Sequence, residues 1–437
     1  MKRIAIIGAG LAGLECARLL QGAGLSVVLL EAADAPGGRV RTDNVEGYLL
    51  DRGFQVLLTA YPEARRALDY NDLHLHTFLP GALVWHGGRF HRFADPFREP
   101  VAAMTLLFDP VISILDKLKI ARLRNRVCRL KDDECFEQPE STTKAFLNKF
   151  GFSDKITRRF FVPFFGGVFL EDDLVTSSRY FEFLFKMFSI GSVCIPSRGM
   201  EEIPKQLAAS LDPDTLVLGA RVKSLKRSKG KFTLQVEGAA AIEAEMVVVA
   251  TDGPEAKRLL SEAGASMEKP GTQKWNSTTT FYYSADQRPV GEAILVLNGE
   301  GRSTGPVNHF VVMSAVSRSY APKGFHLLSV NVVGQAPDND VDVAKLETEV
   351  REHLVGWFGG QVREWRLLGG FPIRHAVPQQ KSAAWEKSAL WSQLGDSNDP
   401  LNRIYLCGDH RETSSIQGAL SSGRRVAEAI LQQQSEK

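Results

Sequence analysis

Three glycines near the start of the chain have the spacing of a phosphate-binding turn. Gly8, Gly10 and Gly13 form the pattern G-x-G-x-x-G, and Glu31 follows the pattern after about twenty residues. In such a turn the first glycine permits the tight bend, the second lets a pyrophosphate approach the backbone, and the third lets helix and strand pack closely. Glu31 can accept hydrogen bonds from ribose hydroxyls, and its charge would repel a 2′-phosphate. These residues predict a dinucleotide site and disfavour NADP as the ligand.

Further groups suited to phosphate follow the acidic residue. The segment "PGGRVRT" (36–42) places Arg39 directly after a Gly-Gly turn, and a guanidinium can bind phosphate through two parallel hydrogen bonds. The segment "YLLDRGFQVL" (48–57) then brings Gly53 after a short strand. The glycine turn alone does not separate NAD from FAD.

The elements that must hold these residues can be read from the apolar runs. Residues 4–7 and 25–30 are typical of buried strands, and the segment between them is typical of a helix. The run 246–250 fits a central parallel strand, and residues 404–407 form another before Gly408, Asp409 and a final helix. The sequence therefore predicts an α/β fold with a strand–turn–helix crossover at both ends of the chain.

The order of these motifs resembles the superfamily of flavin amine oxidases, phytoene desaturases and protoporphyrinogen oxidases. Its members carry G-x-G-x-x-G, E, G-G-R-x-x-T and D-x-G in this order. The stretches 197–208, 219–260 and 362–379 and the tail from Gly408 also match, so the resemblance runs from Lys2 to about Leu431. It implies noncovalent FAD, with the glycine turn at the ADP portion and the tail at the flavin end.

The resemblance also implies which residues contact FAD. The backbone of Val222 would meet the adenine, Asp409 the pyrophosphate–ribityl portion, and the amide near Ile416–Gln417 the N1–O2 edge of the flavin. A helix N-terminus at that edge would stabilise the negative charge of reduced flavin. The predicted FAD contacts are Gly8, Ala9, Gly10, Leu11, Ala12, Gly13, Glu31, Ala32, Gly38, Arg39, Val40, Gly53, Phe54, Gln55, Val222, Ala250, Thr251, Gly408, Asp409, Ile416 and Gln417.

No catalytic side chain is identified besides the flavin itself. Arg374 and His375 are the ionisable residues of the segment 362–379, which approaches the active site in the superfamily. Packing or a phosphate-side contact is the alternative interpretation for both residues.

The predicted fold is a Rossmann-like FAD-binding domain with a parallel sheet, interleaved with an α+β substrate domain. Residues 1–71, 196–265 and 396–437 are assigned to the FAD domain, and residues 72–195 and 266–395 to the substrate domain with a helical cap. Alternating apolar and polar residues in the second substrate segment predict a mixed or antiparallel sheet with one exposed face, which would form the floor of the cavity over the flavin.

Two stretches of the predicted cap leave alternatives open. The segment 158–188 is rich in phenylalanine and fits either a well-filled core or an apolar channel for a bulky lipophilic substrate. The segment 101–126 fits either an ordinary buried helix pair or helices lying at a membrane surface.

Bulk properties exclude several other classes. The net charge of +2 implies no nucleic-acid partner, and the arginine run at 119–131 is typical of a solvated helix face. The five cysteines are scattered without a C-x-x-C pair, which argues against disulfides or a metal site and favours a reducing cytoplasm. Strand-like residues from Arg3 leave no room for a signal peptide, and no run of 18 apolar residues occurs. We expect a cytoplasmic location, with peripheral membrane contact as an alternative.

These observations predict an FAD-dependent oxidoreductase that takes a hydride equivalent from a C–H bond of a lipophilic, isoprenoid-like or related molecule. A second G-x-G-x-x-G unit is missing, because "GEGRSTG" (299–305) has the wrong spacing, so oxygen or a quinone is the expected electron acceptor. Amine or amino-acid oxidation is the alternative, but the lysine that the superfamily's amine oxidases keep near the flavin cannot be placed in 277–301. A flavin-dependent isomerase and a non-catalytic lipid-binding protein of the same fold are further alternatives. The oligomeric state stays open.

Overall fold

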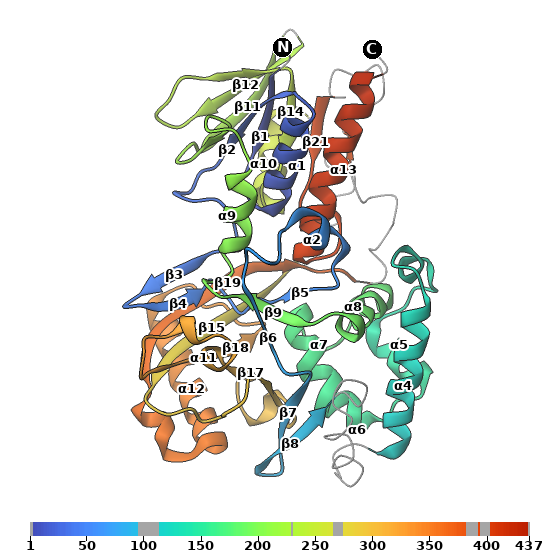
Figure 1. The fold of residues 1–437 in the computed structure, drawn as a ribbon, viewed down its shortest axis with the longest axis vertical. Coiled ribbons are helices and arrows are strands. Elements are labelled where there is room, and N and C mark those ends of the chain that lie inside the picture. The colour runs from blue at the N-terminus through green and yellow to red at the C-terminus, as the bar shows by residue number, and fades with distance from the viewer. Residues whose placement is uncertain are drawn as a thin grey trace.

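The computed structural model describes residues 3–94, 113–228, 230–264, 274–381, 392–393 and 403–435, and it has an α/β fold built on two large sheets (Figure 1). One sheet has six strands in the order β10-β2-β1-β14-β21-β20. All neighbours in it are parallel except β20, which runs antiparallel to β21. Its strands are β1 (Arg3–Ile7), β2 (Ser26–Leu30), β10 (Leu216–Val217), β14 (Met246–Val249), β20 (Ser392–Gln393) and β21 (Ile404–Leu406).

Both faces of the parallel sheet are covered, which explains why its central strands are apolar throughout. Alternate residues of β1 and β14 belong to two different hydrophobic clusters. Helices α1 (Leu11–Gly22) and α13 (Ile416–Ser435) cover one face (Figure 1). The other face packs against α10 (Gly253–Glu262) and a three-stranded meander of β11 (Val222–Ser228), β12 (Lys231–Val236) and β13 (Ile242–Ala244).

The second sheet has seven strands in the order β19-β15-β18-β17-β16-β7-β8. It is antiparallel except for the parallel pair β16–β7. Its strands are β7 (Gly81–His86), β8 (Arg89–Ala94), β15 (Trp275–Ala285), β16 (Leu295–Asn298), β17 (Val307–Val312), β18 (His326–Val333) and β19 (Arg366–Pro378).

The prediction that this sheet has one exposed face is wrong. Helix α12 (Asp340–Phe358) packs on one face, and the other face belongs to the large cluster that includes α1, α7 and α8. Strands β17 and β18 are buried almost along their whole length. The polar residues that produced the alternating pattern are therefore inside the protein.

Helices form the predicted cap beside the second sheet (Figure 1). They are α4 (Ile114–Arg129), α5 (Thr143–Phe150), α6 (Asp154–Ile156), a π-helical turn (Thr157–Phe161), α7 (Val162–Phe169) and α8 (Ser178–Ile190). Phenylalanines of α7 and α8 pack ring against ring, as in Phe165–Phe181 at 4.7 Å between centroids, so the core alternative describes this cluster.

Residues 113–126 are the described part of the segment for which membrane contact was considered, and they include most of α4. Ile114, Leu115 and Leu118 are each more than half exposed there. Residues 95–112, which include 101–112 of that segment, lie outside the described residues. Within the described ranges no helix is long and apolar enough to cross a bilayer.

Shorter elements connect the two sheets. They are the hairpin β3 (Thr42–Val45)–β4 (Tyr48–Asp51), the small sheet β5 (Leu57–Leu58)–β9 (Val193–Pro196)–β6 (Leu75–Thr77), and helices α2 (Pro62–Ala67), α9 (Glu202–Ala209) and α11 (Met313–Val316). The parallel sheet thus takes strands from both ends of the chain and from 216–249, and the second sheet from 81–94 and 275–378. The exact domain boundaries stay a prediction.

The contact between α1 and α13 gives the first test. A Cβ on Gly423 would lie 2.2 Å from the carbonyl oxygen of Ala12, and backbone cannot move aside cheaply. We expect Gly423→Ala to lower the free energy of unfolding by about 3 kcal/mol. The matched control is Gly356→Ala within α12, where a Cβ meets nothing within 4 Å and a gain of about 0.5–1 kcal/mol is expected. Denaturant unfolding of both variants measures the difference, and equal stabilities would contradict the close packing.

Candidate functional site

The glycine turn between β1 and α1 is closed tightly against β14. Gly8 has φ +104°, and its N–H donates to the carbonyl oxygen of Leu30 at 2.8 Å. A Cβ on Gly8 would meet the Ala250 oxygen at 2.8 Å, and one on Gly13 would meet the Gly8 oxygen at 2.0 Å. These two positions therefore serve close packing, as their places in the motif predict.

Gly10 differs from Gly8 and Gly13 because open space surrounds it. A Cβ at Gly10 would meet nothing within 4 Å, and no side chain caps the start of α1. The Gly37–Gly38 turn lies alongside, since Gly37 N–H donates to the Ala9 oxygen at 2.8 Å. Helix α1 begins at Leu11. The amides of its first turn therefore lie next to open space, as the binding of a phosphate would require.

Glu31 lies at the end of β2 and points into the turn. One carboxylate oxygen accepts the Ala9 N–H at 2.7 Å, and the other accepts the Ala33 N–H at 2.9 Å. Each oxygen keeps lone-pair capacity for a further donor. Ala32 beside it is exposed, and the Val40 amide closes the following turn onto the Gly37 oxygen.

Arg39 joins the two ends of the chain. Its guanidinium donates to Asp409 Oδ1 at 2.5 Å and to the Ala376 carbonyl oxygen at 2.7 Å, and it lies over the Trp275 ring. Asp409 is buried, so the ion pair fixes the Gly-Asp turn against the Gly-Gly turn. Two residues that the sequence assigned to one cofactor from opposite ends are therefore in contact.

Gly53, Phe54 and Gln55 lead from this junction to the second sheet. Gly53 has φ +95°, and the side chain of Ile373 occupies the place of its Cβ. Phe54 N–H donates to Thr280 Oγ1 at 3.2 Å, and Gln55 Nε2 donates to the Arg39 carbonyl oxygen at 2.8 Å. Gln55 Oε1 is buried without a partner among the described residues, so it is available to a bound group.

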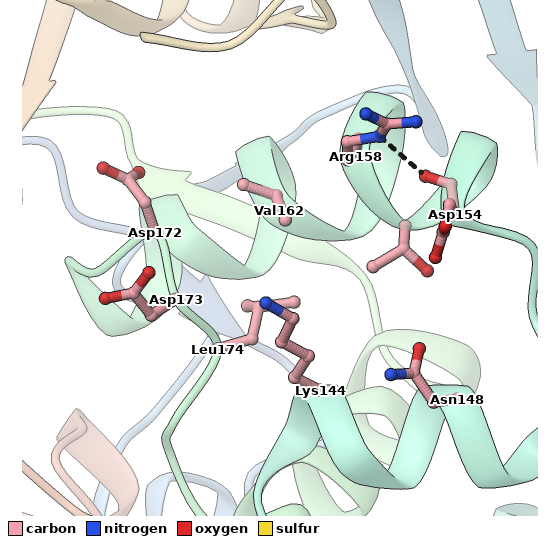
Figure 2. A pocket seen from close by; sticks show the side chains of 9 residues that line it. Lys144, Asn148, Asp154, Arg158, Val162, Asp172, Asp173 and Leu174 are labelled. Atoms are coloured by element: carbon pink, nitrogen blue, oxygen red, sulfur yellow. Dashed lines mark hydrogen bonds between the residues drawn. The ribbon is translucent and has the colours of Figure 1, made fainter.

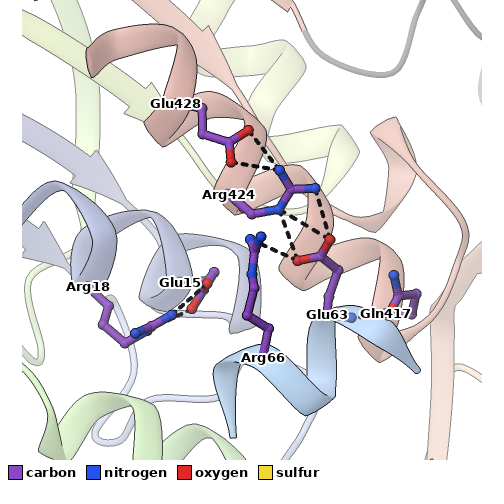
Figure 3. A network of polar contacts seen from close by, with 7 residues as sticks. All are labelled: Glu15, Arg18, Glu63, Arg66, Gln417, Arg424 and Glu428. Carbon is purple, nitrogen blue, oxygen red and sulfur yellow. Dashed lines mark hydrogen bonds and ion pairs between the residues drawn. The ribbon is translucent and has the colours of Figure 1, made fainter. Parts of the chain in front are cut away.

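The start of α13 is fixed by α2. The Glu63 N–H donates to Gln417 Oε1 at 2.9 Å, and the Glu63 carboxylate pairs with Arg424 at 2.9 Å (Figure 3). Arg66 also pairs with Glu63, and Glu428 pairs with Arg424, so the network holds both helices together.

The loop that precedes α13 is held just as firmly. Gly408 N–H donates to Ser422 Oγ at 3.0 Å, and Gly418 N–H donates to Ser415 Oγ at 3.1 Å. A Cβ on Gly418 would meet the Thr413 oxygen at 1.9 Å, so this glycine does allow close packing. Burial raises the pKa of Glu412 in this loop to about 7, although Arg425 pairs with it at 2.6 Å.

The remaining predicted cofactor residues lie around the same sheet. Ala250 N–H donates to the Ile7 oxygen at 2.8 Å, Thr251 follows it, and Val222 is buried at the start of β11. The carbonyl oxygen of Val222 accepts from Arg258 at 3.3 Å.

Arg374 and His375 are both exposed on β19. Arg374 pairs with the exposed Asp338, and the His375 ring lies 5.5 Å from the Trp275 ring. Their positions give no support to a catalytic base, and their roles stay a prediction.

Sequence reasoning missed Asp51, whose side chain joins three segments of the chain near the site by hydrogen bonds. Its buried carboxylate accepts from Thr42 Oγ1 at 2.5 Å, from the Met200 N–H at 2.9 Å and from Tyr320 Oη at 3.1 Å. Burial outweighs these hydrogen bonds and raises the pKa of Asp51 to about 6. The D-x-G pattern was the available signal, but the partners come from distant segments.

Gln380 was missed as well, and no local motif marks it. It is buried at the end of β19, where its Oε1 accepts the Ser414 N–H at 3.0 Å and its Nε2 donates to the Glu412 oxygen. Gln380 therefore ties the loop before α13 to the second sheet.

A cavity of about 400 Å³ lies elsewhere, between α5 and the π-helical turn of the cap (Figure 2). Its lining is mostly exposed and carries charges of both signs. It contains none of the predicted cofactor residues. The lining consists of Lys144, Asn148, Asp154, Thr157, Arg158, Val162, Asp172, Asp173 and Leu174.

Comparison with known proteins agrees with this geometry. The sequence model of the flavin-containing amine oxidoreductases matches residues 11–431. The chain is 26% identical to protoporphyrinogen oxidase 2 of Arabidopsis thaliana, an alignment that covers 98% of this chain and 94% of that protein. It is 25% identical to phytoene dehydrogenase of Streptomyces griseus, over 84% of this chain and 76% of that protein. A solved structure of a putrescine oxidase triple mutant has the same fold, with a TM-score of 0.71 at 17% identity and 99% coverage of both chains.

The fold and these matches define the class: the protein is an FAD-dependent α/β oxidoreductase. The chain belongs to the family of flavin-containing amine oxidoreductases, and FAD is its cofactor. The alternative of a non-catalytic lipid-binding protein is therefore set aside.

Asp51 predicts how stability depends on pH. Its folded pKa of about 6 lies above the ordinary 3.8, so its contribution is full below pH 3.8 and is lost as the pH rises through 6. The difference corresponds to about 3 kcal/mol. We expect Asp51→Asn to become more stable relative to the unchanged protein between pH 4 and about pH 7. Urea unfolding at several pH values measures this, and parallel pH curves would contradict it.

Proposed function

We propose that this enzyme removes a hydride equivalent from a C–H bond of a lipophilic small molecule, in a desaturase- or dehydrogenase-like reaction on an isoprenoid or related compound. The observation that carries the proposal is the group of uncharged side chains beyond Gly53. Phe54, Thr280, Asn331 and a neutral His309 lie there, and α7 of the phenylalanine cluster packs on β17 beside them. Uncharged surroundings suit an apolar substrate better than an ammonium ion, whose desolvation is costly. Relatives named protoporphyrinogen oxidase and phytoene dehydrogenase support the same class.

The residues present fit FAD. The open space at Gly10, the uncapped first turn of α1 and the unpartnered Gln55 Oε1 are what a bound dinucleotide would complete. We infer that Gly10 and α1 hold the pyrophosphate, that Glu31 holds the ribose, and that Asp409 and the start of α13 hold the flavin end.

When bound, FAD supplies the acceptor for the hydride equivalent. The chain supplies position and polarity. The first amides of α13 would stabilise negative charge at the flavin end. The aromatic cluster of α7 and α8 would keep water from the reacting centre. Oxygen or a quinone would take the electrons onward, because only one dinucleotide fingerprint is present in the sequence.

Amine or amino-acid oxidation is the second candidate, since the family is described as amine oxidoreductases. It predicts hydrogen peroxide on addition of amines. The neutral side chains on this face of β15 and β18 do not favour it.

The role of Glu31 gives a test of the cofactor site. Glu31→Gln removes the charge that would receive the ribose hydroxyls, so we expect FAD affinity to fall about tenfold. Titration of cofactor-free protein with FAD by flavin fluorescence measures the dissociation constant. Glu46→Gln is the control, because Glu46 is exposed on the β3–β4 hairpin and pairs with Arg366. A lower melting temperature of the cofactor-free variant would assign the loss to the turn instead of the ribose.

The reaction itself is tested by anaerobic reduction. Purified holoenzyme is mixed in turn with carotenoids, porphyrinogens and amines, and the flavin absorption at about 450 nm is followed. We expect bleaching by a lipophilic C–H donor. Bleaching by amines alone, with peroxide on admission of air, would establish the second candidate in its place.

A further inference from the structure

A buried histidine on the second sheet stands beside the cofactor residues. His309 lies on β17 and is 3% exposed. Its ring centroid is 4.8 Å from that of Phe54, which directly follows Gly53. On its other side is α7, because a Cβ on Gly167 would meet His309 Nδ1 at 3.1 Å. The imidazole therefore lies where the loop after Gly53, the second sheet and the phenylalanine-rich helix α7 meet.

An irregularity in β17 aims this side chain. Val307 pairs with Val332 and His309 with Asn331, so two residues of β17 oppose one of β18. Such a bulge turns consecutive side chains to one face, and bulges often re-aim residues next to active sites. A Cβ on Gly167 would accordingly meet both Asn308 Oδ1, at 2.8 Å, and the His309 ring, on the face that carries Asn331 and Thr280.

One hydrogen bond of the ring indicates its tautomer. Nδ1 lies 2.9 Å from Asn308 Oδ1, and an amide oxygen can only accept, so Nδ1 carries the proton. Nε2 is then a lone-pair acceptor. It is buried and has no partner within the described part of the chain. Burial lowers the pKa of His309 to about 3, so the ring stays neutral at ordinary pH.

We propose that His309 is a specificity-determining residue whose Nε2 accepts a hydrogen bond from a neutral N–H or O–H group of the substrate. This inference rests on the proposed function and narrows it to lipophilic molecules that carry such a donor, against pure hydrocarbons. An unmet acceptor is costly to bury, so a substrate that satisfies it is preferred over an analogue that cannot.

The test uses two ligands that differ in one donor. Indole carries an N–H, and 1-methylindole does not. Binding to the holoenzyme is measured by perturbation of the flavin spectrum and by the ligand-induced rise in melting temperature. We expect the unchanged protein to bind indole about fivefold tighter than 1-methylindole.

Two substitutions at the same position separate the acceptor from the fold. His309→Asn keeps a donor toward Asn308 and removes the acceptor at the Nε2 position. This variant should therefore bind indole and 1-methylindole with about equal affinity. His309→Gln places an amide oxygen near that position and should retain most of the preference. The control is His326→Asn at the start of β18, a half-buried histidine whose pKa burial also lowers, away from the β17 bulge. It should keep the full preference.

Several outcomes would overturn the inference: no binding of indole, no preference in the unchanged protein, an unchanged preference in His309→Asn, or equal loss in both His309 variants. None of these outcomes depends on turnover. Failure of the proposed function would appear separately, as absence of flavin bleaching by every lipophilic C–H donor.

Discussion

The structure depends on a few places where backbone touches backbone. At Gly13 a side chain would stand 2.0 Å from the Gly8 oxygen, and at Gly423 one would stand 2.2 Å from the Ala12 oxygen. These contacts bring β1, α1 and α13 so close that the first and last helices cover the same face of one sheet. The separation of these elements sets where the start of α1 lies relative to the loop before α13, and thus the distance between the two ends of the predicted cofactor site.

This packing explains why the chain returns to its beginning before it ends. Strand β21 pairs with β14, which pairs with β1, so the tail completes the parallel sheet. The Gly-Asp turn that follows β21 meets Arg39 through a charge-assisted hydrogen bond. Gln380 and Tyr180, from the second sheet and the cap, hold the next residues of the loop. The tail is therefore positioned by the parallel sheet, by Arg39, and by residues of the second sheet and the cap.

Local patterns predicted much of this arrangement, because the glycine turn, its acidic partner and the apolar parallel strands each follow from residues close in sequence. Contacts between residues far apart in the sequence could not be predicted in this way. Asp51 acquires partners from Thr42, Met200 and Tyr320, and no spacing rule links those positions. The exposed face expected for the second sheet was an error of the same origin. Its threonines and asparagines alternate like solvent-facing residues, yet Thr278 and Thr280 both donate to the buried Asn331.

The polar residues on this face of the second sheet differ in whether their hydrogen-bonding groups have partners. Asn331 Oδ1 receives two hydroxyls, and Thr280 in turn accepts the Phe54 N–H, so these groups have partners and position the loop after Gly53. His309, the next position across the sheet, has one nitrogen bonded to Asn308 and the other without a partner among the residues that the structure describes. A leucine there would fill space without the penalty of about 1–3 kcal/mol that an unmet buried acceptor carries. A ligand that brings its own donor to this face of the sheet would satisfy the second nitrogen.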